Sequence, residues 1–251
     1  MPDLAPVTDD DHAVAAQLAT EAGELLVALR AKDDGMVPWQ LGDLGDWEAH
    51  KLLVARLAEL RPDDAVLSEE GVNDPARLAN PRVWIVDPLD GTREYGEIPR
   101  VDWAVHVALV VDGRAAIGAV ALPAQGLTLA THPAPPPPPH HDGPPRMVVS
   151  RSRPPRAAQR IAAAIGAEQV PLGSAGAKTM AVVRGDADIY AHAGGQYEWD
   201  SAAPVAVAAA AGLHTSRLDG SPLVYNQPDP YLPDLLICRP ELADRVLAAL
   251  T

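Results

Sequence analysis

Residues 83–92 read VWIVDPLDGT. Four apolar residues lead into an aspartate, and the proline that follows disfavours a helical backbone at Asp87, so we expect a buried strand that ends there. The proline and Gly91 favour a tight turn, which would bring Asp90 back towards Asp87. The stretch therefore predicts a strand end at which two carboxylates and the Leu89 carbonyl converge.

This predicted turn offers the ligands that a hard divalent cation prefers. Mg²⁺ in particular is bound by a few carboxylates together with waters and substrate phosphate oxygens. The backbone amides of Gly91 and Thr92, if they open a helix, would face a phosphate. The alternative is a surface turn in which the aspartates only accept backbone hydrogen bonds. Carboxylates elsewhere in the chain favour the metal site.

Three of these carboxylates lie beside other predicted elements. Glu69 follows the short apolar run 65–67, and Asp200 precedes the alanine-rich segment 202–211. Asp46 opens a segment with helical spacing. The alternatives are a solvated acidic turn at Glu69 and helix N-caps at Asp46 and Asp200. Their order and context favour one shared site.

The apolar spacing predicts the remaining elements. We expect a helix over 9–31 and a second helix from near Asp46 to Pro62, with a polar segment that contains Gly42 and Gly45 between them. The other expected strands are 65–67, 83–86, 103–111, 115–122, 147–150 and 187–192, and the other helices are 157–165, one opening at 174–177, and 202–211.

A proline-rich segment separates two compositional halves. Residues 133–145 read PAPPPPPHHDGPP, which cannot form a central strand or helix because proline lacks the amide donor. We expect an α+β domain over 1–132 that carries most metal ligands and an α/β domain over 146–251. The adjacent His140 and His141 are expected to be solvated in this loop.

Composition excludes several classes of function. The chain has 251 residues and a formal net charge of −14, which argues against a nucleic-acid polymer as partner. Cys238 is the only cysteine, so an internal disulfide and a thiolate metal site are excluded. We expect a cytoplasmic protein without a membrane partner, because no apolar run approaches the about 20 residues that span a bilayer. Cations would have to lie between so acidic a site and an anionic substrate.

Taken together, the acidic motifs resemble those of the magnesium-dependent, lithium-sensitive inositol-monophosphatase-like superfamily. The matching positions are Asp46, Glu69-Glu70, Asp87 to Thr92, and Trp199-Asp200. The flanks Gly173 to Lys178 and Glu198 to Ala203 are most similar to the CysQ branch, the bacterial and particularly actinobacterial phosphatases of 3′-phosphoadenosine 5′-phosphate (PAP). The resemblance implies a layered α/β/α/β/α sandwich of the sugar-phosphatase type.

The resemblance also implies a ligand set for two or three Mg²⁺ ions. Glu69, Asp87 and the Leu89 carbonyl would bind one ion, Asp87, Asp90 and Asp200 a second, and Glu69 a looser third. Thr92 and Asp46 would orient and deprotonate the attacking water. The implied substrate contacts are Glu69, Leu89, Asp90, Gly91, Thr92, Ser174, Lys178 and Asp200. Inhibition by Li⁺ and Ca²⁺ is expected.

The implied function is that of a 3′(2′),5′-bisphosphate nucleotidase, which hydrolyses PAP, with its sulfated form PAPS as a further candidate, to AMP and phosphate in sulfate assimilation. The alternatives are an inositol-1-phosphate or fructose-1,6-bisphosphate phosphatase, and a non-catalytic metal- or nucleotide-binding protein. Ser174 and Lys178 would suit a second phosphate, with a solvated Lys178 as the alternative. The region around Glu198 or Asp219 would meet a ribose or base. The sequence leaves the oligomeric state open, with a homodimer as one possibility.

Overall fold

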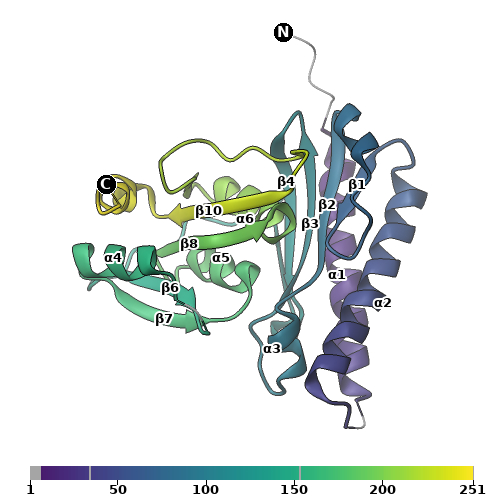
Figure 1. The fold of residues 1–251 in the computed structure, drawn as a ribbon, viewed down its shortest axis with the longest axis horizontal. Coiled ribbons are helices and arrows are strands. Elements are labelled where there is room, and N and C mark those ends of the chain that lie inside the picture. Colours follow the sequence, from purple (N-terminus) through teal and green to yellow (C-terminus); the bar gives the residue numbers. More distant parts are fainter. Residues whose placement is uncertain (1–6, 34, 153, 251) are drawn as a thin grey trace.

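The computed structural model describes residues 7–33, 35–152 and 154–250. Residues 1–6 and 34 of the expected first domain, and residues 153 and 251 of the second, lie outside these ranges. Figure 1 shows five layers, in which helices and sheets alternate. The expected α/β/α/β/α sandwich is therefore confirmed. Within the described residues, no helix is both long and apolar enough to cross a membrane.

The first two layers come from the N-terminal half. Helices α1 (Asp9–Ala31) and α2 (Pro38–Leu60) cover one face of a five-stranded sheet. In spatial order its strands are β1 (Ala65–Ser68), β2 (Arg82–Asp90), β3 (Ala104–Val111), β4 (Arg114–Leu122) and β5 (Leu127–Ala130). Only β1 and β2 pair in parallel. The short helix α3 (Thr92–Gly96) follows β2, and the 3₁₀ turns are Pro75–Ala79 and Pro123–Gln125.

The other three layers come from the C-terminal half. Helices α5 (Ala175–Arg184) and α6 (Glu198–Ala210) lie between the two sheets, and α4 (Arg156–Ile165) and α7 (Ala243–Ala248) lie on the outside. The second sheet has the order β7 (Glu168–Leu172), β6 (Arg146–Ser150), β8 (Ile189–Tyr197), β10 (Tyr231–Cys238) and β9 (His214–Ser216). Strands β7, β6 and β8 are parallel, whereas β10 is antiparallel to β8 and β9. A 3₁₀ turn, Pro240–Leu242, precedes α7.

The apolar core explains why the layers hold together. Strand β3 is buried on both faces, because Val105 and Val107 pack towards α1 and α2 while Ala108 and Val110 pack towards α5 and α6. Its sequence is accordingly an almost continuous apolar run. The central cluster also contains residues of the second sheet, such as Tyr190. The two halves therefore share one core across α5 and α6.

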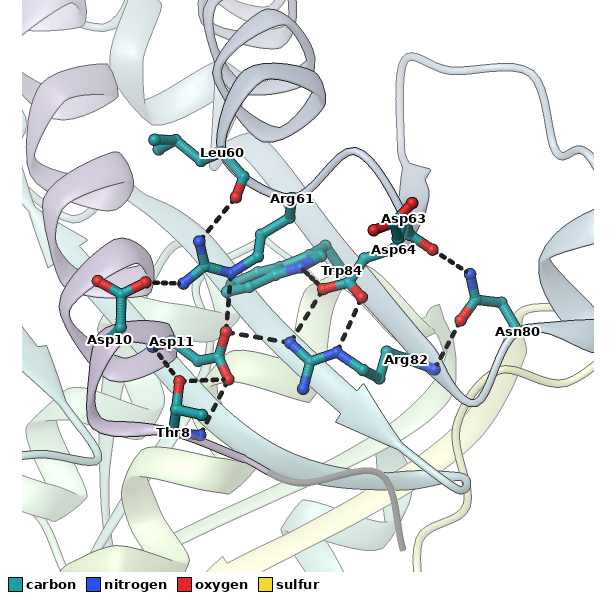
Figure 2. A network of polar contacts seen from close by, with 10 residues as sticks. All are labelled: Thr8, Asp10, Asp11, Leu60, Arg61, Asp63, Asp64, Asn80, Arg82 and Trp84. Atoms are coloured by element: carbon teal, nitrogen blue, oxygen red, sulfur yellow. Dashed lines mark hydrogen bonds and ion pairs between the residues drawn. The ribbon is translucent and has the colours of Figure 1, made fainter.

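A polar network fixes the ends of three elements far along the chain from one another (Figure 2). Asp11, in the first turn of α1, accepts hydrogen bonds from the Thr8 amide at 3.0 Å, Arg61 Nε at 2.8 Å and Arg82 Nη2 at 3.0 Å. Burial opposes ionisation of Asp11, but these donors outweigh it and lower its pKa to about 2. The network ties α1 to the end of α2 and the start of β2.

Several expected boundaries were wrong: β8 ends at Tyr197 rather than 192, α6 begins at Glu198 rather than 202, and α2 and β2 also differ. Helix α2 begins at Pro38 rather than near Asp46, so Asp46 lies inside the helix and cannot be its N-cap. Gly42 and Gly45, expected in a polar segment between the helices, lie inside α2 and are contact positions: a Cβ at Gly42 would come within 2.6 Å of Thr92 Cγ2. Strand β2 also continues past Asp87 to residue 90, through an irregularity in its pairing with β3.

The proline-rich segment forms no helix or strand, and the two sheets lie on either side of it in sequence. It is bound to the C-terminal half, because the Arg239 guanidinium donates to the Pro138 and Pro139 carbonyls. His141 lies 2.7 Å from a carboxylate oxygen of Asp188 and is only partly exposed, so its expected solvation was wrong. The proposed domain boundary at 133–145 stays a prediction.

Candidate active site

Residues 87–90 are buried rather than part of a surface turn, and residues 91 and 92 are half-buried. Asp87 and Asp90 are only 1% and 7% exposed, so the surface-turn alternative is wrong. Gly91 has a φ of 90°, a left-handed conformation that favours glycine and lets α3 begin at Thr92. The Asp87 carboxylate accepts the Leu89 amide at 3.1 Å. The segment thus turns two carboxylates towards the interior.

A third carboxylate joins them from the other half of the chain. Asp200 lies in the first turn of α6, where its carboxylate accepts the Tyr197 amide at 2.6 Å. Carboxylate oxygens of Asp87, Asp90 and Asp200 all lie within 4.8 Å of one another. The structure therefore brings together the three residues expected to bind one of the cations.

This arrangement fits a divalent cation. Among the described residues, Asp87 Oδ2 is buried and has no hydrogen-bond partner. A buried carboxylate oxygen without a donor is costly unless a cation compensates it, and three carboxylates supply the hard oxygen ligands that Mg²⁺ prefers. Glu69 is exposed and lies outside this close group, whereas the Leu89 carbonyl oxygen lies 3.1 Å from the Thr92 hydroxyl oxygen. The ligand roles of these two residues stay predictions.

Mutual repulsion marks the site electrostatically. Burial and the neighbouring Glu69 raise the pKa of Asp87 well above its ordinary value. Burial and like charges raise the pKa of Asp46 to about 7 and that of Asp200 to about 6. Glu69 is exposed overall, yet neighbouring protein shields its carboxylate from much of the water, and this together with Asp200 raises its pKa to about 8. Bound cations would relieve this repulsion.

A pH-dependent stability follows from these shifts. A carboxylate whose pKa is raised on folding ionises first in the unfolded chain, so the stability of the metal-free protein should fall as pH rises from about 4 to 8. We expect the melting temperature of metal-free protein to be lower at pH 8 than at pH 5.5, by at least about 2–4 °C. Scanning calorimetry at both pH values tests this. Mg²⁺ should raise the melting temperature more at pH 8, and equal increments would contradict the prediction.

Asp90 behaves in the opposite way because α5 holds it. Burial disfavours its charge, but His106, Lys178 and Ser174 outweigh burial and lower the pKa of Asp90. Its carboxylate accepts the Ser174 hydroxyl at 2.5 Å and the Gly176 amide at 2.6 Å, and the Ala175 amide also donates to it at 3.0 Å. The backbone amides at the start of α5 therefore already donate their hydrogen bonds to Asp90.

Lys178 is buried, so its alternative as a solvated helix lysine was wrong. Its ammonium donates to the Gly173 carbonyl at 2.9 Å and to the Ser174 carbonyl at 2.7 Å, which closes the turn before α5. Contacts of Ser174 and Lys178 with a second phosphate stay predictions. Glu198 is also buried, and both its oxygens accept backbone amides of residues 226 and 227, so it is not free to meet a ribose.

Thr92 and Asp46 form the expected pair. The Thr92 hydroxyl donates to Asp46 Oδ2 at 2.8 Å. Because Gly42 lacks a Cβ, the Thr92 side chain can pack directly on α2 one turn before Asp46. Asp46 Oδ1 is buried and has no hydrogen-bond partner among the described residues. The pair thus presents one free carboxylate oxygen beside the acidic group.

Sequence reasoning missed His106. Its ring is fully buried, and Nδ1 lies 3.0 Å from the Trp199 carbonyl while Nε2 lies 3.2 Å from Asp90 Oδ2. In the sequence, His106 is marked by being a titratable residue inside the apolar run 104–111.

A cavity of about 350 Å³ lies between the end of β6 at Ser150, Pro155 and the first part of β8. The Tyr190 ring on its wall is 5.3 Å from Lys178 Nζ. Its lining residues are Ser150, Pro155, Tyr190, Ala191, His192, Ala193, Gly194 and Gly195.

The chain is similar to proteins of known family. The model of the inositol monophosphatase family matches residues 10–133 and 145–251. A Mycobacterium leprae protein named 3′-phosphoadenosine 5′-phosphate phosphatase is 52% identical over 96% of this chain and 93% of its own length. The Escherichia coli 3′(2′),5′-bisphosphate nucleotidase CysQ is 31% identical over 86% of this chain and 94% of its own. The crystal structure of CysQ from Bacteroides thetaiotaomicron superposes with a TM-score of 0.78 at 26% identity, covering 92% of this chain and 97% of that one.

Proposed function

Because the chain belongs to the inositol monophosphatase family, we propose that it is a metal-dependent phosphatase that hydrolyses PAP to AMP and phosphate. The relatives from Mycobacterium leprae and Escherichia coli are named a PAP phosphatase and a 3′(2′),5′-bisphosphate nucleotidase, and both align over most of their length. Both halves of this chain match the family model, so the similarity includes every residue of the carboxylate group.

One observation carries the proposal: a group of three carboxylates, two of them buried and the third half-buried, lies beside a hydroxyl–carboxylate pair. The carboxylates Asp87, Asp90 and Asp200 would hold divalent cations, with Mg²⁺ as the proposed ion. When bound, such cations activate a water and neutralise charge on the phosphate and its leaving oxygen. A protein that only binds nucleotides has no use for the Thr92–Asp46 pair.

The pair has the geometry of a base and its orienting group. The Thr92 hydroxyl donates to Asp46 and so presents its lone pairs, rather than its proton, to an approaching water. Asp46 would take up the proton that this water loses. Burial is the main cause of the raised pKa of Asp46, and it makes this carboxylate a stronger base than an ordinary aspartate.

The adenosine part of PAP would lie in the cavity between the end of β6 and the first part of β8. Its volume is within the range of about 300–1,000 Å³ that is usual for small-molecule sites. No charged side chain lines it among the described residues. His192 contacts the Gly195 carbonyl through Nε2 at 2.9 Å, which leaves Nδ1 to accept the Tyr190 hydroxyl at 3.2 Å. These paired neutral groups suit an uncharged heterocycle better than a second phosphate.

Phosphate release from PAP, inositol-1-phosphate and fructose-1,6-bisphosphate, measured side by side with Mg²⁺, tests the proposal. We expect the highest kcat/KM for PAP. A higher value for either sugar phosphate would overturn the substrate assignment but keep the phosphatase. Release from none of them by a protein that binds Mg²⁺ would favour a non-catalytic binding protein. Hydrolysis of PAPS, inhibition by Li⁺ and a cytoplasmic location accompany the proposal as predictions.

A further inference from the structure

His106 lies where the segments that carry the three carboxylates meet. In the pairing of β2 with β3 it is directly opposite Asp87, and Asp87 Oδ2 is 3.8 Å from its Nδ1. The same nitrogen bonds to the Trp199 carbonyl, in the first turn of α6 immediately before Asp200. The other nitrogen lies 3.2 Å from Asp90 Oδ2. One ring therefore contacts the segments of all three carboxylates.

Helix α5 leaves room for this ring. A Cβ at Gly176 would come within 2.2 Å of His106 Nε2, so any larger residue there would displace the imidazole. The Gly176 amide donates to the same Asp90 oxygen that the imidazole faces. The oxygen thus accepts a hydrogen bond from the start of α5 and lies against the imidazole of β3.

We infer that His106 is a positioning residue for the cation site: it orients the Asp90 carboxylate and holds the first turn of α6, with Asp200, against β3. No backbone pairing joins β3 to α6, whereas the imidazole bonds directly to the Trp199 carbonyl. The inference rests on the proposed function, because it assumes that the carboxylates hold cations. Groups that orient metal ligands typically change metal affinity or activity by about 10–100-fold when they are removed.

Replacement of His106 by leucine fills the site with an apolar side chain of similar size and removes both ring nitrogens. We expect calorimetric titration of the metal-free variant with Mg²⁺ to give a Kd about 10–100-fold above that of the wild type. The KM for PAP at saturating Mg²⁺ should stay within about twofold, because the ring contacts carboxylate segments rather than the cavity. A folded His106→Leu protein with the Mg²⁺ affinity of the wild type would overturn the inference, whatever its melting temperature.

Val110→Ala is the matched control. Val110 lies on the same strand and is equally buried, but it packs in the apolar core. Its truncation should lower the melting temperature and leave Mg²⁺ affinity unchanged. If Val110→Ala weakens Mg²⁺ binding as much as His106→Leu does, the effect is one of general stability and the inference fails.

Three further variants keep the test decisive if His106→Leu does not fold. His106→Asn places an amide nitrogen near the position of Nδ1 and His106→Gln near that of Nε2, so each should retain part of the affinity. Gly176→Ala should weaken Mg²⁺ binding with the imidazole still present, because the added methyl displaces it. Unchanged affinity in all three would overturn the inference. A wild type that binds Mg²⁺ but releases no phosphate from PAP would overturn the proposed function alone.

Discussion

Removal of divalent cations should lower phosphate release from PAP by at least about 10³-fold, and added Mg²⁺ should restore it. The reason is electrostatic: Asp87, Asp90 and Asp200 would repel a phosphate dianion unless cations lie between them. Cations contribute several kcal/mol of charge stabilisation in such reactions, and each 1.4 kcal/mol corresponds to about tenfold in rate. The measurement is phosphate release after exhaustive chelation and dialysis, followed by titration with Mg²⁺.

Calcium supplies the control for this experiment. Ca²⁺ should bind the same carboxylates, and so raise the melting temperature, but support little turnover because its looser coordination misplaces the attacking water. Undiminished turnover in the metal-free protein would refute metal dependence. If Ca²⁺ restores stability but not activity, cation binding alone is not sufficient for turnover, and the coordination geometry of the cation is also required.

The convergence of Asp87, Asp90 and Asp200 could be predicted from sequence because each is marked by its local context. The first two follow an apolar strand and share a turn with a proline and a glycine, and Asp200 opens an alanine-rich helix. The layered fold followed from the resemblance that these motifs carry. Local patterns were sufficient because strand ends and helix starts meet at one edge of this kind of fold.

Residues whose role depends on distant partners could not be predicted in this way. Gly42 and Gly45 have the signature of a helix break, but the structure uses them as contact points for α3 and its neighbours. His106 stands in an apolar run, and its carbonyl partner lies 93 residues away. The burial of Lys178 depends on two carbonyls of a turn in which Ser174 has a positive φ of 41°.

Strands with weak patterns were missed for a related reason. Strands β7 and β10 contain Pro171 and Pro233, which demote a segment to an edge or irregular position. β7 is indeed at the edge of its sheet, and β10 has a register shift at its proline. β9 has only three residues, too few to show alternation. Each of these strands forms because hydrogen bonds and packing with its neighbours in the sheet stabilise it, although its own sequence pattern is weak.

Loss of the Thr92–Asp46 pair should stop the reaction without emptying the cation site. Thr92→Val keeps the methyl group that packs against Gly42 and removes only the hydroxyl that donates to Asp46. Asp46→Asn keeps the shape and removes the base. Each should lower kcat by roughly 10²-fold or more, the scale of a lost general base, with Mg²⁺ affinity from calorimetry little changed.

A comparison of several variants tests whether Thr92 and Asp46 act as one functional unit. Because both residues would act on one water, the double variant should be scarcely slower than either single variant. Thr92→Ser retains the hydroxyl and should keep most activity. Asp200→Asn should behave differently, since it weakens a cation ligand and excess Mg²⁺ should partly restore its rate. Asp46 lies inside α2 and caps no helix end, so a lower melting temperature with intact kcat in Asp46→Asn would reduce it to a packing residue and refute its role as the base.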